Sequence, residues 1–166
     1  MVFGKKKGGK IVSQDNDGKA TLEFPSGSKY SGELKNGMAD GYGTMYFADG
    51  RQLTGTFEKG KPHGKKIVLT FPDGRQFTGD YTHGKRHGFG EMTFPDGKKY
   101  EGEWENDLPH GEGTMTHPNG TVEQGTWIRG NIIDPSAREE GGGGLSRILA
   151  LLVILVIAGV MIFIFW

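Results

Sequence analysis

Large apolar residues recur along this chain at a fixed spacing, in pairs that flank a single glycine. The five copies of this large-x-Gly-x-large pattern span Tyr30–Leu34, Leu53–Phe57, Phe77–Tyr81, Tyr100–Trp104 and Glu123–Trp127, the last with a polar first residue. Successive copies begin 23, 24, 23 and 23 residues apart. A period of this size indicates one supersecondary unit that is copied and stacked.

Each unit contains two segments of alternating apolar and polar residues that flank a Gly-rich connection, and a short turn closes the unit. The turns are Pro25–Gly27, Ala48–Gly50, Pro72–Gly74, Pro95–Gly97 and Pro118–Gly120, and most contain Asp-Gly or Asn-Gly. Alternation of period two indicates strands, and Asp-Gly between two strands indicates a β-hairpin. We therefore expect one hairpin per unit, with consecutive hairpins side by side in a meander.

The two large residues of each copy and the glycine between them share one face of a strand. The glycine leaves a gap over which the rings of neighbouring units can lie, so that stacked hairpins bury a continuous ladder. The predicted columns are Leu34, Phe57, Tyr81, Trp104 and Trp127; Tyr30, Leu53, Phe77 and Tyr100; and Phe24, Phe47, Phe71 and Phe94. His117 and Glu123 interrupt two columns near one end, as a capping unit requires.

These residues resemble the MORN (membrane occupation and recognition nexus) repeat family, whose pattern is Tyr-x-Gly-x-Trp-x-x-Gly-x-x-x-Gly-x-Gly. Residues Tyr100–Gly113 nearly match it, except that Asp107 takes one glycine position. Residues Tyr30–Gly43 match it with Leu34 as the second large residue. The resemblance covers roughly residues 18 to 130.

The copy that begins at Leu53 departs furthest from this pattern. Lys65-Lys66 stands where the last Gly-x-Gly would be complete, and one extra residue precedes Phe71. An extra residue in one strand produces a β-bulge, which we expect here.

The resemblance implies an all-β fold, an elongated single-layer antiparallel meander with a groove on one side. It also implies binding rather than catalysis, so we expect no enzyme and no cofactor. The predicted partner is a helix or an extended peptide in the groove. Its predicted contacts are Tyr81, Trp104 and Trp127, with Tyr100 and Phe77, although the same rings are also the predicted stacking core.

The C-terminal segment carries a different signal, because residues 148–166 contain no charged side chain. As a helix, 19 residues extend about 28 Å, close to the hydrocarbon core of a bilayer. We expect a transmembrane helix at 147–166 that acts as a C-terminal anchor. Arg147 on its near side favours a cytoplasmic repeat domain. The lack of basic residues after it favours an endomembrane or the plasma membrane over the mitochondrial outer membrane.

These patterns divide the chain into four parts. A flexible basic segment at 1–17 precedes the repeat domain at 18–133, and a Gly-rich linker at 134–146 leads to the anchor. Lys5, Lys6, Lys7 and Lys10 have no acidic neighbours and are candidates for contact with anionic lipid headgroups.

Composition excludes several other functions. The formal net charge of zero argues against a broad basic surface for nucleic acid, and the lack of cysteine excludes disulfides and thiolate metal sites. Gly55–Lys61 and Gly79–Lys85 resemble phosphate-binding loops but lie between strands rather than before a helix. The histidines beside glycines, His63, His87 and His110, and nearby His83 are interpreted as structural, so no metal site is expected.

Three hypotheses for function remain. The first is an adaptor that holds a protein partner at the cytoplasmic face of a membrane. The second is a tether between two membranes, because junctophilins are similar in joining MORN repeats to a C-terminal anchor. The third is an accessory single-pass subunit of a larger membrane complex.

Overall fold

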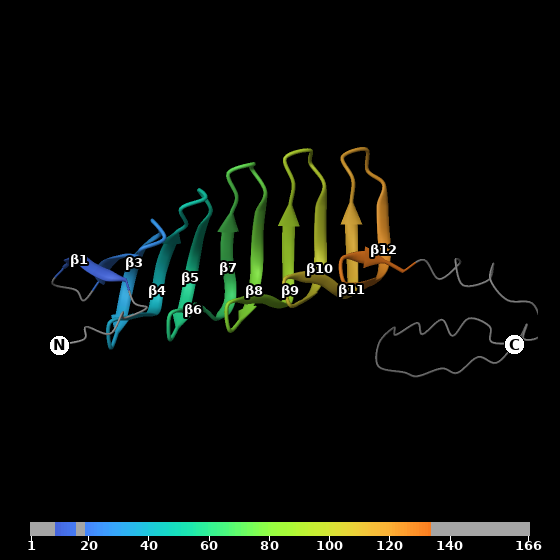
Figure 1. Ribbon diagram of the computed structural model, residues 1–166. Helices are drawn as coiled ribbons and strands as arrows, with labels where there is room; N and C mark the ends of the chain where they lie inside the picture. Colours follow the sequence, from blue (N-terminus) through green and yellow to red (C-terminus); the bar gives the residue numbers. More distant parts are fainter. Residues whose placement is uncertain (1–8, 16–18, 134–166) are drawn as a thin grey trace, which may run out of the picture. The chain divides into compact units, whose positions relative to one another are not determined.

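The computed structural model describes residues 9–15 and 19–133. These residues form one antiparallel sheet of 13 strands and contain no helix. The strands are β1 (Lys10–Gln14), β2 (Lys19–Glu23), β3 (Lys29–Lys35), β4 (Met38–Tyr46), β5 (Gln52–Glu58), β6 (Lys61–Pro62), β7 (Gly64–Thr70), β8 (Gln76–Thr82), β9 (Lys85–Thr93), β10 (Lys99–Glu105), β11 (Leu108–Thr116), β12 (Val122–Ile128) and β13 (Asn131–Ile132). Their order in the sheet follows the chain, with β6 as a side branch on β5 (Figure 1). The predicted single-layer meander is therefore confirmed.

Upper turns, at residues 24–28, 47–51, 71–75, 94–98 and 117–121, connect strands at the top of Figure 1. In each, the glycine N–H donates to the carbonyl of the residue three positions earlier, as Gly74 does to Phe71 at 3.0 Å. Gly74 has φ of 90°, a left-handed conformation that glycine adopts without steric cost. These are the turns that Asp-Gly predicts.

Lower turns connect the strands at their opposite ends, at residues 35–38, 58–61, 82–85, 105–108 and 128–131. The sequence analysis did not predict these turns. Both central residues have positive φ, as in Asn36 (53°) and Gly37 (73°), which is the signature of a type I′ hairpin turn. Asn-Gly at 36–37 is the strongest sequence signal for such a turn. The Gly-rich stretch that we interpreted as a connection is in fact the turn and first half of a long strand.

Neighbouring lower turns are joined to one another by backbone hydrogen bonds. The second turn residue donates its N–H to a carbonyl one repeat earlier, as Gly84 does to Pro62 at 2.8 Å and Gly130 does to Pro109 at 2.9 Å. These bonds link consecutive hairpins at the lower turns, close to the points where the strand pairing shifts register.

The bulge expected in the unit that begins at Leu53 is confirmed. β7 and β8 lose register between Gly64 and Ile67, and Lys66 within that interval has φ of 55°. Register shifts also occur in three strand pairs joined by lower turns, between Gly32 and Leu34, for example. The other strand pairs joined by upper turns keep their register, so the bulge at Lys66 is specific to this unit.

The sheet begins before residue 18. Residues 10–14, which the sequence placed in a separate N-terminal segment, form β1 and pair with β2. β1 and β2 therefore form an additional antiparallel strand pair before the first copy of the pattern. At the other end, β13 covers only Trp127 and Ile128 of β12.

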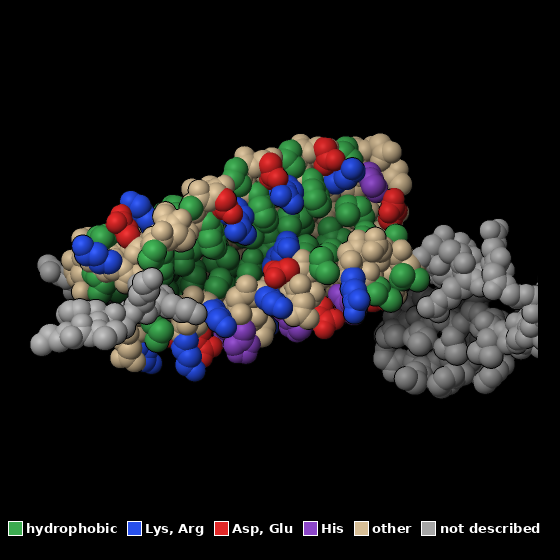
Figure 2. All heavy atoms as spheres, viewed as in Figure 1, with side chains coloured by type: hydrophobic (Ala, Val, Ile, Leu, Met, Phe, Trp, Pro, Cys, Tyr) green, Lys and Arg blue, Asp and Glu red, His purple; other side chains and the backbone are tan. Residues whose placement is uncertain are grey.

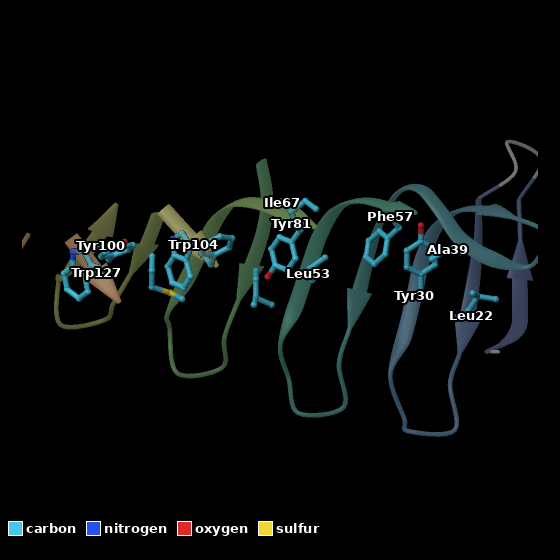
Figure 3. Packing of buried hydrophobic residues seen from close by; sticks show 13 residues of the cluster. Leu22, Tyr30, Ala39, Leu53, Phe57, Ile67, Tyr81, Tyr100, Trp104 and Trp127 are labelled. Carbon is cyan, nitrogen blue, oxygen red and sulfur yellow. The ribbon is translucent and has the colours of Figure 1, made fainter. Parts of the chain in front are cut away.

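One face of the sheet holds the apolar core and is called the inner face. It carries the first and second large residues of each copy, the glycines between them and a column that sequence analysis missed (Figure 3). The missed column is Leu22, Met45, Leu69, Met92 and Met115, which repeats with the same steps as the others. Each of these residues lies opposite a first large residue, as Met92 lies opposite both Phe77 and Tyr100.

Rings lie directly over the glycines, but each comes from the same unit rather than from a neighbouring one as predicted. A Cβ added to Gly90 would lie 2.6 Å from two carbons of the Phe77 ring. Three second rings also pack edge-on against the first ring of the preceding copy: Phe57 against Tyr30, Trp104 against Phe77 and Trp127 against Tyr100, each at 5.0 Å between centroids. The indole Nε1 of Trp104 donates to the Gly90 carbonyl at 3.1 Å.

In the unit that begins at Leu53, a larger residue replaces one of the glycines and a smaller residue replaces the ring above it. Ile67 takes the place of the second glycine, and its Cγ1 would be 2.7 Å from a Cβ on Gly55. The residue that would lie over this position is Leu53 rather than a ring. A larger residue below and a smaller one above fill the same volume, which keeps the packing density of the core.

Candidate binding groove

The inner face is the floor of an apolar groove that runs across the strands. Figure 2 shows this continuous apolar strip between two polar rims, formed by the upper and lower turns. The floor residues that keep partial exposure are Phe24, Leu34, Met45, Phe47, Phe71, Phe94, Met115 and Ile132. Within the described residues, no second layer covers this face, so its apolar side chains can contact a partner.

The upper rim is nearly neutral because its charges are paired within each turn. Asp73 accepts hydrogen bonds from the backbone N–H of Arg75 at 3.1 Å and from its Nε at 2.8 Å. These bonds from Arg75 hold the pKa of the Asp73 carboxyl below its usual value. The Arg75 guanidinium lies 4.5 Å from the centroid of the Phe71 ring, and Arg51 repeats this arrangement over Phe47 at 4.7 Å.

The lower rim is basic at its centre. The turns at residues 58–62 and 82–86 carry four cations, Lys59, Lys61, Lys85 and Arg86, against one anion, Glu58. His63 directly follows the first of these turns and His83 lies in the second, with ring centroids 5.3 Å apart. The His83 backbone N–H donates to Nδ1 of His63 at 3.4 Å. This histidine pair therefore connects two neighbouring repeats.

One charged pair lies within the groove itself. Arg86, whose side chain is 17% exposed, extends over the inner face with its guanidinium 4.5 Å from the Trp104 ring and 5.4 Å from Phe77. Its Nη2 donates to the Asp107 carbonyl at 2.7 Å, and its Nε lies 3.4 Å from Asp107 Oδ1. Asp107 Oδ1 also accepts the Arg86 backbone N–H at 3.0 Å.

Tyr81 lies beside this pair. Burial raises the pKa of Tyr81 to about 12, with Asp107 acting in the same direction and Arg86 opposing it. Burial also raises the pKa values of Tyr30 and Tyr100 to about 12, and their hydroxyls donate to the carbonyls of Glu33 and Glu103, both at 3.0 Å.

The five rings predicted as partner contacts lie in the core of the sheet. Phe77, Tyr81, Tyr100, Trp104 and Trp127 are each 6% exposed or less. Their area is used by packing between hairpins, and the partly exposed floor residues around them offer more contact surface. Contact between a partner and the five rings stays a prediction.

Of the four predicted lipid-binding lysines, only Lys10 lies within the described residues. Lys10 is exposed at the start of β1, where its charge contributes to holding the pKa of the Glu23 carboxyl low, behind the larger effect of Lys29. Lys5, Lys6 and Lys7 lie outside the described residues, as do the linker at 134–146 and the predicted anchor at 147–166. Within residues 9–15 and 19–133, no helix is long and apolar enough to cross a membrane.

The outer face carries the polar residues of each strand. Glu101, Glu103 and Glu105 are exposed there, and Lys99 bridges Glu91 and Glu101 at 3.1 Å each. In the part of the chain that the structure describes, no group of three or more His, Cys, Asp or Glu side chains is arranged to hold a metal ion.

Comparison with known proteins identifies the repeat. A family model described as the MORN repeat matches residues 30–50, 54–65, 77–99 and 100–122. The shortest match falls on the unit with the Lys65–Lys66 bulge, and the sheet continues beyond the matched residues at both ends. No curated protein sequence matches the chain.

One similar solved structure is the TCP domain of SAS-4 (dCPAP) of Drosophila melanogaster, in complex with a proline-rich motif of Ana2 (dSTIL). Its TM-score is 0.43 and its sequence identity is 16%. The match covers 66% of this chain and 60% of that chain.

Proposed function

Because residues 30–122 contain four MORN repeats, we propose that this protein is a non-enzymatic adaptor whose groove holds a segment of a protein partner at a membrane. The repeat sheet supplies the binding surface, and residues 147–166 supply the anchor. The partner segment is a helix or an extended peptide with an apolar side.

The observation that carries this proposal is the open apolar groove. Contiguous apolar surface that is rimmed by polar residues is typical of interaction sites. An amphipathic helix fits such a groove by inserting one apolar side and leaving its polar side in water. The rings and Met45 or Met115 suit this role, because rings give rigid contact area and methionine adapts its shape to a partner.

The membrane part of the proposal rests on the sequence of the tail. An uncharged run of 19 residues has the length of a bilayer span. The test is alkaline carbonate extraction of membranes that contain the full chain or a chain that ends at residue 140. We expect the full chain to stay with the membrane and the shorter one to be released. Release of both would refute the anchor.

Photocrosslinking from the two faces of the sheet tests the groove. Phe94 lies at the groove floor, whereas Phe89, on the same segment, is 55% exposed on the outer face. A photoreactive phenylalanine analogue at either position changes the side chain conservatively. We expect crosslinks to a partner from position 94 in the full chain in cells, and few from position 89.

A reversed pattern, in which only position 89 crosslinks, would place the binding surface on the outer face. Equal crosslinking from both positions would indicate random encounters. Either result would contradict the groove as the binding site.

A further inference from the structure

Arg86 and Asp107 are both exceptions to the repeat, and they contact each other. Arg86 belongs to a row whose other members are uncharged: Ala39, Pro62, Pro109 and Ile132. Each of these pairs in register with the second large residue of its copy. Asp107 belongs to a row whose other members are Gly37, Gly60, Gly84 and Gly130. The two exceptions come from adjacent repeats, 21 positions apart.

The fold does not require this pair. Asp107 has φ of 72°, a conformation that glycine adopts more easily in the equivalent turns. Proline is accepted at the Arg86 position in two other units. The turn-to-turn bond from Asp107 N–H to the Arg86 carbonyl, at 3.1 Å, is made by backbone atoms and recurs with glycine elsewhere.

The guanidinium is held in a fixed position with donors to spare. Arginine has five N–H donors, and among the described residues Asp107 accepts only from Nε and one N–H of Nη2. The guanidinium carbon lies 4.5 Å from the centroid of the Trp104 ring on the inner face, and the Arg86 side chain keeps 17% of its surface exposed. An arginine arranged in this way binds a carboxylate with two parallel hydrogen bonds.

We propose that Arg86 is the charged anchor of the groove and that it binds an Asp or Glu side chain of the docked partner segment. This inference rests on the proposed groove function. It identifies the partner as a peptide segment with an apolar side that carries one carboxylate, flanked by acidic rather than basic residues. Lys59 and Lys61 on the nearby rim favour the same sign of charge.

The physical reason is the cost of burial. A segment that covers the groove removes water from the three remaining donors of Arg86. An apolar side chain at that position leaves these donors unsatisfied and a neutral amide accepts from one of them, whereas a carboxylate accepts from two. The pair therefore selects between segments that fit the apolar floor equally well.

The test begins with a displayed library of peptides of about 18 residues, long enough for a helix of about 27 Å. The library is selected against the full chain in lipid nanodiscs and against the variant Arg86→Pro with Asp107→Gly. This variant restores residues that the repeat already uses at both positions, so it is a matched control that keeps the fold. Circular dichroism checks that its sheet content is unchanged.

We expect peptides selected on the unchanged protein to share an apolar period and one Asp or Glu at a fixed place in it. Peptides selected on the variant should keep the apolar period and lose the acidic position. In the best peptide, exchange of that residue for Asn or Gln should weaken binding to the unchanged protein about tenfold or more. The same exchange should alter binding to the variant less than about twofold.

Other outcomes separate this inference from the proposed function. Apolar peptides without a fixed acidic position would overturn the role of Arg86 and leave the groove intact. Peptides whose binding is unaffected by Phe94→Lys, but reduced by Phe89→Lys, would overturn both. Concentration-dependent dimers of the full chain that Phe94→Lys abolishes would identify a second copy as the occupant, and would overturn the acidic partner.

Discussion

Substitution of Gly90 by alanine tests whether rings held against glycines join the hairpins. The added Cβ would lie 2.6 Å from two carbons of the Phe77 ring, whereas the nearest backbone atom, Gly79 Cα, is 3.3 Å away. Phe77 has no exposed surface, and Tyr81 and Trp104 hold its ring edge-on at 5.7 and 5.0 Å. The ring cannot move aside without breaking these contacts. Overpacking of this kind costs about 1–3 kcal/mol of unfolding free energy.

Gly125→Ala is the matched control within the same glycine rows. Its Cβ would meet nothing closer than Cδ1 of Ile132 at 3.4 Å, an ordinary contact, and its φ is not left-handed. Alanine at such a position reduces the freedom of the unfolded chain and stabilises by about 0.4–1 kcal/mol. The two substitutions are chemically identical but meet different surroundings. Their effects on the free energy of unfolding should therefore have opposite signs.

The assay is urea unfolding of a fragment that ends at residue 140, followed by tryptophan fluorescence. Without Trp166, the signal comes from Trp104 and Trp127, which both lie in the ring ladder. Circular dichroism on the same samples checks that the repeats unfold together, since long arrays can lose cooperativity.

A second substitution, Phe77→Leu, isolates the ring as the cause. Leucine over a larger residue already occurs in the unit of Leu53 and Ile67. Gly90→Ala should therefore cost less in the Phe77→Leu background, by about 1 kcal/mol or more, as contacting residues are not additive. Costs that simply add, or equal effects of alanine at positions 90 and 125, would refute the argument.

Three further predictions follow from the turns and the buried hydroxyls. Spectroscopic titration should show Tyr30, Tyr81 and Tyr100 ionising at about pH 12. Because the pKa values of these hydroxyls are raised in the folded protein, their contribution to the free energy of unfolding is present below about pH 10 and is lost as pH rises toward 12. Asp73 has a lowered native pKa, so its contribution is present above about pH 4 and lost as pH falls, and Asp73→Asn should make acid unfolding less steep in this range. Gly97→Ala should lower the urea midpoint, at a cost of about 1 kcal/mol or more, because φ of 85° strains any side chain.

Much of the fold could be predicted because the same strand and turn patterns recur in every unit. A single Asp-Gly is weak evidence for a hairpin, but five turns in step indicate a meander. The second row of turns was missed because most of its members, such as His83-Gly84, do not look like a turn in isolation. Their conformation follows from the twist of the flanking strands, which favours type I′ turns.

The site was harder to predict than the fold. An aromatic residue on a sheet face can line a groove or fill the core, and the pattern alone does not separate these roles. The outcome depends on how closely the ring approaches the glycines: Phe77 lies flat against its own hairpin, while Phe94 keeps exposed surface. The sequence showed Asp107 as a departure, but its partner Arg86 lies in the preceding repeat, and only the stacked structure brings the two together.

The most direct test of the central claim, that the inner face of the sheet binds a partner segment, is NMR of methyl-labelled methionine. Met45 and Met115 lie on the groove floor, whereas Met38 is exposed at a lower turn. On titration with the selected peptide or the crosslinked partner segment, the methyl signals of Met45 and Met115 should shift while that of Met38 stays in place. A shift of Met38 alone, or binding with no change at Met45 and Met115, would contradict the account.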